Sequence, residues 1–125
     1  MAERIRFIHH QGKKILLVDL SNLPPGEFEK LVRQVPDYVT VQPRGSVLVL
    51  TDFTAAVFNR DTIRAVKETA VFDKPFIKKS ALIGTETFPV EFYEELKSFS
   101  RRELLIFRTR DEALTWLVAE ATSGS

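Results

Sequence analysis

The chain lacks cysteine altogether, so none of its 125 residues can form a disulfide, act as a thiolate nucleophile or hold a cysteine-ligated metal. Long apolar stretches are missing as well. The uninterrupted apolar runs, such as residues 15–18 and 47–50, are far shorter than the roughly 20 residues of a membrane-spanning helix. No apolar stretch follows the charged residues near the N-terminus, so we expect no secretory signal. These absences predict a cytoplasmic protein without a membrane span.

An excess of charge of either sign is also missing. The sequence has 18 Lys and Arg residues against 17 Asp and Glu residues, which gives a net charge of +1. Binding to a nucleic-acid duplex calls for a strongly basic face. The basic pairs Lys13-Lys14, Lys78-Lys79 and Arg101-Arg102 each flank an apolar run, which favours solvated ends of strands and helices. We therefore expect no nucleic-acid partner.

The amounts of apolar and charged residues, 44% and 28%, are those of an ordinary globular domain. A chain of this length buries roughly two thirds of the surface that it exposes when unfolded, which suffices for one core. We expect one domain over residues 1–121 and a disordered tail over residues 122–125.

The hydrophobic pattern predicts five strands. Side chains of different polarity alternate over residues 5–10, which indicates an edge strand. Gln11-Gly12 then indicates a hairpin turn into an antiparallel strand at residues 14–18. The further apolar runs are separated by helical stretches, which is typical of βαβ units. They lie at residues 47–50, 81–83 and 104–107. The predicted fold is a single α/β domain with a mixed, mostly parallel five-stranded sheet and the element order β-β-α-β-α-β-α-β-α.

Proline and capping residues bound the predicted helices. Four strands are apolar at consecutive positions, so both faces of the sheet must be covered. Right-handed crossovers place their helices on one face, and the other face then needs a displaced helix or a second subunit. The helices are expected from Pro24-Pro25 to Pro36, where the helix ends or kinks, from Asn59 to Lys74-Pro75, over residues 87–100, and from Thr109 onward.

Polar residues follow the strands, at the edge where open parallel sheets bind ligands. Asp19 and Asp52 take corresponding positions on two strands, as paired carboxylates for acid–base chemistry or magnesium would. The Gly-rich phosphate loop and its lysine are missing, however, and no nucleophile-elbow motif is present. His9 and His10 point to opposite faces of a strand and cannot chelate one ion together. We therefore expect no enzyme, no metal site and no cofactor; turn and cap roles account for the polar rim.

The connection Phe53–Phe58 is unusually apolar for a segment that follows a strand. If it is exposed, it marks an interface. If it is buried, its phenylalanines close the end of the core. The sequence leaves both interpretations open. The candidate interaction residues in and beside this connection are Asp52, Phe53, Thr54, Val57, Phe58, Asn59 and Asp61.

Several strings make the chain similar to a known family. They are KILLVDLS at residues 14–21, LVLTDF at 48–53, KPFIKK at 74–79, ALIG at 81–84 and FRTRDEALTWL at 107–117. With the order of elements, they resemble the bacterial STAS-like domains, which are related to anti-sigma-factor antagonists. The resemblance implies a mixed sheet packed by helices and a role in regulatory protein association rather than in catalytic turnover.

The resemblance also implies a phosphorylation candidate. Phosphorylatable STAS domains carry a Ser or Thr at the start of the helix after the central strand, and residues 59–63 match that stretch here. Thr62 is the hydroxyl residue in the matching stretch. The glycine that usually follows is replaced by Ile63, and Asp61 already occupies the positive end of the helix, where its charge repels a phosphate.

The leading functional hypothesis is a non-enzymatic regulatory protein–protein interaction module of the STAS-like type in bacterial signalling. Its protein partner is unknown, and a homodimer is one form that the association could take. The alternative is a small apolar-ligand or lipid-binding domain, in which the polar rim and some of the ten phenylalanines form a pocket. An enzyme that uses Asp19, Asp52 or Glu86 ranks last, because no second catalytic partner can be named.

Overall fold

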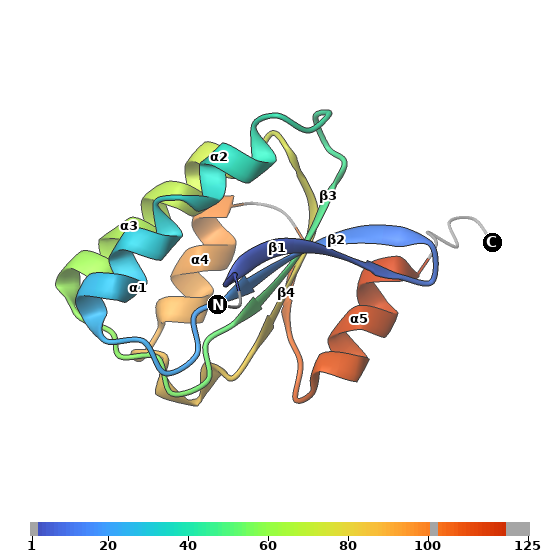
Figure 1. Cartoon of the computed structure of the whole chain (residues 1–125). Helices are drawn as coiled ribbons and strands as arrows, with labels where there is room; N and C mark the ends of the chain where they lie inside the picture. The colour runs from blue at the N-terminus through green and yellow to red at the C-terminus, as the bar shows by residue number, and fades with distance from the viewer. Residues whose placement is uncertain (1–2, 101–102, 120–125) are drawn as a thin grey trace.

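The computed structural model describes residues 3–100 and 103–119 (Figure 1). The predicted tail, residues 122–125, and the domain boundary at 121 lie outside the described residues, so both remain predictions. In chain order the elements are β1 (Ile5–His10), β2 (Lys13–Asp19), α1 (Pro25–Val32), α2 (Val35–Val39), β3 (Val47–Asp52), α3 (Arg60–Asp73), β4 (Ile77–Ile83), the 3₁₀ turn η1 (Thr85–Thr87), α4 (Phe92–Ser100), β5 (Glu103–Ile106) and α5 (Arg110–Val118).

The five strands form one sheet in the order β1-β2-β3-β4-β5. β1 and β2 are antiparallel, whereas each later neighbour pair is parallel, so the predicted mixed, mostly parallel sheet is confirmed. All four residues from Ile15 to Val18 on β2 are at most 3% exposed, although their side chains alternate between the two faces. Both faces of the sheet are therefore buried, as the unbroken apolar runs predict.

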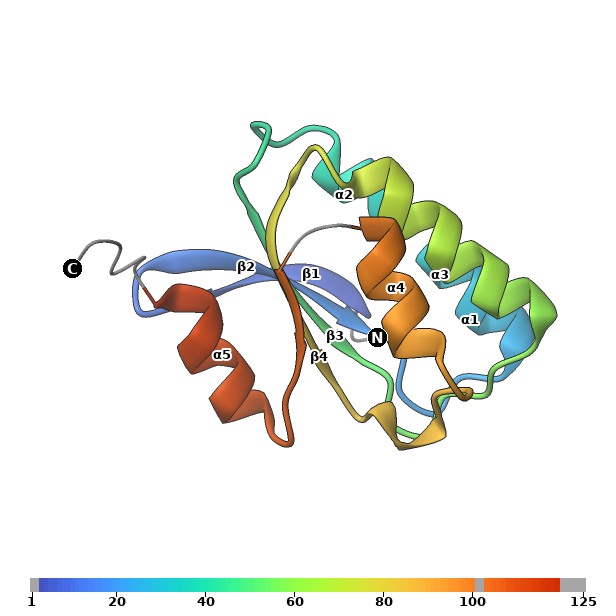
Figure 2. The same ribbon diagram turned by 180° about the vertical axis from the view of Figure 1, so that it is seen from behind.

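Helices cover the two faces unequally. Figures 1 and 2 show α1, α2, α3 and α4 on one face and α5 alone on the other. The buried residues accordingly form two clusters, and the cluster under α5 joins Ala113, Leu114, Leu117 and Val118 to the facing residues of β2, β3 and β4. The second face is thus covered by a displaced helix of the same chain. No helix within residues 3–100 and 103–119 is long and apolar enough to cross a membrane.

Ion pairs join the helices of the larger layer at its surface. Arg33, the C-cap residue of α1, binds Glu29, one turn earlier, and Glu68 on α3, and these two hydrogen bonds raise the pKa of Arg33. Lys67 on α3 lies 2.7 Å from Glu95 on α4. Exposed pairs of this kind contribute little to stability, because water and salt screen them. The layer is therefore held mainly by its apolar contacts with the sheet.

Two predicted helix boundaries are wrong, and proline explains both. The helix expected from residue 87 begins only at Phe92, because Phe88 precedes Pro89 and takes the extended conformation that a residue before proline prefers. The first helix ends at Val32 rather than at Pro36. Pro36 instead lies in the first turn of the short helix α2, where its missing N–H costs nothing.

Gly84, directly after β4, is the glycine that the fold constrains most among those described. Its φ is +67°, and a Cβ there would lie 2.7 Å from Thr54 Cα and closer still to Thr54 N and Oγ1. We expect Gly84→Ala to destabilise the protein by about 3 kcal/mol or more, since the clash adds to the 1–2 kcal/mol cost of left-handed backbone. Urea unfolding followed by circular dichroism measures this change.

Two other glycines serve as controls that separate the steric clash from the cost of left-handed backbone. Gly12 has φ +79° with open space around it, so Gly12→Ala should lose only about 1–2 kcal/mol. Gly26 lies in α1 with neither constraint, and Gly26→Ala should be neutral or gain up to about 1 kcal/mol. A Gly84→Ala loss no larger than that of Gly12→Ala would show that the close approach to Thr54 does not matter.

Candidate functional site

The carboxyl ends of β2 and β3 carry the same polar turn. Asp19 and Asp52 are paired in the register of the two strands. Asp19 Oδ1 accepts hydrogen bonds from the Ser21 backbone N–H at 3.0 Å and from its hydroxyl at 2.6 Å. Asp52 Oδ1 accepts from the N–H and hydroxyl of Thr54 at 2.9 and 2.6 Å. Each aspartate therefore closes its own turn, which is the structural role that the sequence offers for such residues.

The two turns are also joined through their backbones. The Asn22 N–H donates to Thr54 O at 2.8 Å, so pairing continues past the ends of the strands. Asn22 and Ala55, each three residues after its aspartate, share left-handed backbone with φ of 60° and 55°. Alanine carries no side-chain polar group that favours this conformation, so the surrounding structure must hold Ala55 there. The paired turns are thus a rigid edge rather than a flexible rim.

Arg4 fastens the first of these turns from outside the sheet. Its Nη1 donates to Asp19 O at 3.1 Å and to Ser21 O at 2.9 Å, and it lies 3.6 Å from Asp19 Oδ1. Asp19 Oδ1 therefore already has Ser21 and Arg4 as partners. Residues 3–100 and 103–119 contain no group of three His, Asp or Glu side chains placed to hold a metal ion.

Five phenylalanine rings pack together beneath the turns. Their centroids lie 4.9–6.1 Å apart in a connected set, with several edge-to-face pairs. This geometry favours aromatic pairs by about 0.5–1.5 kcal/mol beyond the burial of their area. We call this set the phenylalanine cluster; it consists of Phe28, Phe53, Phe58, Phe88 and Phe92. Phe53 is 2% exposed and Phe58 is half-buried, so both belong to the end of the core.

The segments that carry the cluster nevertheless expose apolar side chains. Val57 is 51% exposed, next to Phe58, and Val90 is 89% exposed, two residues after Phe88. The Val57 N–H donates to Leu23 O at 3.1 Å, which fixes the loop against the connection between β2 and α1. Thr54, Asn59 and Asp61 are exposed beside them, whereas Asp52 is partly buried.

Thr62 lies at the start of α3 in a capping box with Asn59. The Asn59 side-chain oxygen accepts a hydrogen bond from the Thr62 N–H at 2.9 Å, and the Thr62 hydroxyl oxygen accepts one from the Asn59 N–H at 2.7 Å. Thr62 is 0% exposed. A kinase can reach this hydroxyl only after the first turn of α3 opens. Sequence reasoning identified Asn59 as the N-cap but did not foresee that Thr62 completes the box.

A cavity of about 80 Å³ lies between the sheet and the larger helix layer. Most of its lining is apolar, from residues such as Val49, Leu82 and Leu96, but Asp73 on α3 also lines it and is only 3% exposed. Sequence reasoning missed Asp73. Its position three residues after the buried Ala70 on the same helix is the pattern that could have placed it on the inner face.

Comparison with known proteins identifies the fold of the chain but not its function. No profile of a known protein family matches the chain, and no curated protein matches it. A crystal structure of an uncharacterized protein of the DUF3478 family from Shewanella loihica PV-4, described as having a SpoIIAA-like fold, superposes with a TM-score of 0.71. The alignment covers 90% of this chain and 91% of that protein, at 16% sequence identity. The chain thus has the SpoIIAA-like fold of STAS domains, which confirms the resemblance in its strings at the level of fold.

The capping box gives a test of the Thr62 environment. Thr62→Val keeps the shape of the side chain but removes the hydroxyl, so the Asn59 N–H loses its acceptor. We expect a loss of about 1–2 kcal/mol in the free energy of unfolding. Thr62→Ser retains the hydroxyl and should keep most of that stability. Equal losses in the two variants would mean that the methyl group, and not the hydrogen bond, matters at this position.

Proposed function

We propose that the chain is a non-enzymatic regulatory module that binds a protein partner through its strand-end surface. This surface is defined by Thr54, Val57, Asn59, Asp61 and Val90. One observation carries the proposal: two exposed valines stand on segments that the phenylalanine cluster and the paired turns hold in place. Exposed apolar side chains that a partner can cover together favour an interface.

Rigidity makes this surface suited to association. A partner that docks on preformed loops does not have to order them, so more of the contact energy appears as affinity. The surface combines two valines with hydroxyl, amide and carboxylate groups, which resembles the apolar centre and polar rim of protein interfaces. A second copy of the chain and a signalling protein are the two kinds of partner that we consider, both in the cytoplasm.

Chemical turnover is less well supported at this edge. Asp19 and Asp52 are the carboxylates that a catalytic interpretation would use, yet each has an oxygen that accepts two hydrogen bonds within its own turn. Glu86, on η1, is exposed to solvent. A general base must reach a substrate proton and needs a partner that orients it. The two aspartates are hydrogen-bonded within their own turns, and Glu86 points to solvent without a named orienting partner. The arrangement favours binding.

The association is testable by mass in solution. We expect the wild-type chain to self-associate at micromolar concentration in sedimentation velocity, or to bind a signalling protein encoded beside its gene. Val57→Asp combined with Val90→Asp places charges in the apolar part of the surface and should weaken the association at least about tenfold, since a buried unpaired charge costs several kcal/mol.

Val41→Asp is the matched control, because Val41 is 76% exposed after α2 and lies outside the strand-end surface. It should leave association unchanged. A wild-type chain that stays monomeric and binds no product of the neighbouring genes, or a double variant that associates as well as wild type, would refute the proposed surface.

A second candidate function, the binding of a small apolar ligand, rests on the interior cavity. Its volume of about 80 Å³ is below the roughly 300–1,000 Å³ of sites for drug-sized ligands, so the ligand would be small or would move the helices apart. Polar groups in the mostly apolar lining come from Thr51, Thr69, Asp73 and Ser80, the last three of which we take as its polar corner. Such a corner can orient the polar end of a mainly apolar molecule.

Filling the cavity tests this second function. Ala70 lines the cavity and is 8% exposed, so Ala70→Leu should fill much of the space. If an apolar ligand binds there, the fluorescence of 1-aminoanthracene should rise with the wild-type chain and at least about tenfold less with Ala70→Leu, since overlap of a few atoms removes tight packing. Val71→Leu, on the outer side of α3, is the control. Equal fluorescence with wild type and Ala70→Leu would place the dye elsewhere.

A further inference from the structure

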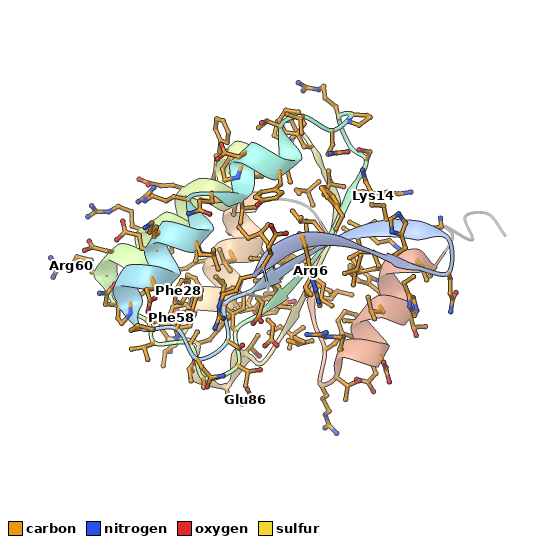
Figure 3. All side chains as sticks on the ribbon, viewed as in Figure 1. Arg6, Lys14, Phe28, Phe58, Arg60 and Glu86 are labelled. Atoms are coloured by element: carbon orange, nitrogen blue, oxygen red, sulfur yellow. The ribbon has the colours of Figure 1, made fainter. Side chains whose placement is uncertain are left out.

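The small net charge hides a strong polarity along the strands. Residues 5–18, 38–51 and 74–85 contain no Asp or Glu, and they include the segments that directly precede β2, β3 and β4. The acids Asp19, Asp52 and Glu86 all follow strands, at the carboxyl ends. Figure 3 shows Lys14 and Glu86 at opposite ends of the molecule. Basic residues of the acid-free stretches are Arg6, Lys13, Lys14, Arg44, Lys74, Lys78 and Lys79.

A groove of about 380 Å³ opens at this basic end. Three segments that are distant in sequence form it: the β1–β2 hairpin, the loop from α2 to β3, and the start of β4. Lys13, Lys14 and Lys78 line it together with the polar Gln42 and Ser46, and none of the acidic side chains that the structure describes does. Phe7, Val47 and Leu48 form its apolar part. Along the chain, every acidic residue lies at least four positions from a residue that lines the groove.

The groove is held open by contacts within the chain. Lys14 Nζ donates to Gln42 Oε1 at 3.2 Å and lies 4.4 Å from the centroid of the Phe7 ring. The loop is fastened to the start of β4, since the Gly45 N–H donates to Pro75 O and the Val47 N–H to Phe76 O, both at 2.9 Å. With its oxygen bound to Lys14, the Gln42 amide presents its NH₂ group as a further donor. Cations and donors are thus placed before any ligand arrives.

We propose that this groove binds a phosphate group. Lysine ammonium groups and an amide NH₂ are donors to phosphate oxygens, and a cationic hollow with low-dielectric walls concentrates anions. The apolar part suits the remainder of a phosphate ester, either a small metabolite or a phospholipid headgroup. The site lies at the other end of the sheet from the strand-end surface, so it goes beyond the proposed partner binding.

The test uses the full chain and two probes. Isothermal titration and amide NMR shifts follow inorganic phosphate, and flotation follows vesicles of phosphatidylcholine with and without phosphatidic acid. We expect phosphate to shift the amides of Lys14, Gln42, Gly45 and Lys78. Lys14→Gln combined with Lys78→Gln should weaken binding at least about tenfold, because each lysine contributes about 1 kcal/mol beside an anionic phosphate.

Lys30→Gln combined with Arg64→Gln is the charge-matched control, because both residues are exposed on the larger helix layer, away from the groove. It should bind like wild type. Binding of inorganic phosphate that only the groove variant loses supports a metabolite site, and flotation with phosphatidic acid alone that only the groove variant loses supports a headgroup site. Absence of both, or equal losses in the groove and control variants, overturns the proposal, whatever the sedimentation result for the strand-end surface.

Discussion

The central strands are apolar on both faces, and this constraint determines how the rest of the chain is arranged. Each of Ile15, Leu16, Leu17 and Val18 is almost fully buried, so helices must cover both faces of the sheet. A simple series of right-handed crossovers would place all its helices on one face and leave the other uncovered. Four helices pack on one face, and α5 alone crosses to the other. Lys79 stabilises that single helix at its carboxyl end, where its Nζ donates to Trp116 O and Ala119 O. A cation at this end also complements the helix dipole.

Once the strands are fixed in parallel register, their two ends acquire different chemistry. At the carboxyl ends, Asp19 and Asp52 become neighbours and close matching turns, and Gly84 permits the close approach of Thr54. At the amino ends, loops without acids bring lysines from separate segments around one groove. At the first end the two aspartates are hydrogen-bonded within their own turns, whereas the second end is hollow and rich in donors. One end therefore suits docking of a surface, and the other suits capture of an anion.

Local sequence signals predicted the strands, the order of elements along the chain and the main caps, because hydrophobic period and capping residues act over a few positions. Asn59 and Thr109 are the N-caps of their helices, as expected. The predicted helix start at residue 87 was wrong. Phe88 is extended because it precedes Pro89, so the helix begins only at Phe92, although the residues after Pro89 have helical apolar spacing. Features that depend on distant contacts were beyond sequence reasoning: the Phe53 and Phe58 rings meet Phe28, Phe88 and Phe92 only in the fold, and Asp73 meets a cavity formed by β-strand residues. The interaction role of the strand-end residues remains a prediction.

The groove also shows why net charge was a weak guide to partners. A total of +1 excludes a uniformly basic surface, but it says nothing about charges that the fold sorts to opposite ends. Taken one at a time, Lys13-Lys14 and Lys78 look like solvated ends of strands. The parallel pairing of β2, β3 and β4 brings them to the same groove as Gln42 and Ser46. Because Lys79 is committed to α5, adjacent lysines on β4 have different roles, with one stabilising the fold and the other facing the groove. Charge at this end is therefore better judged by where each ammonium group lies than by the number of basic residues.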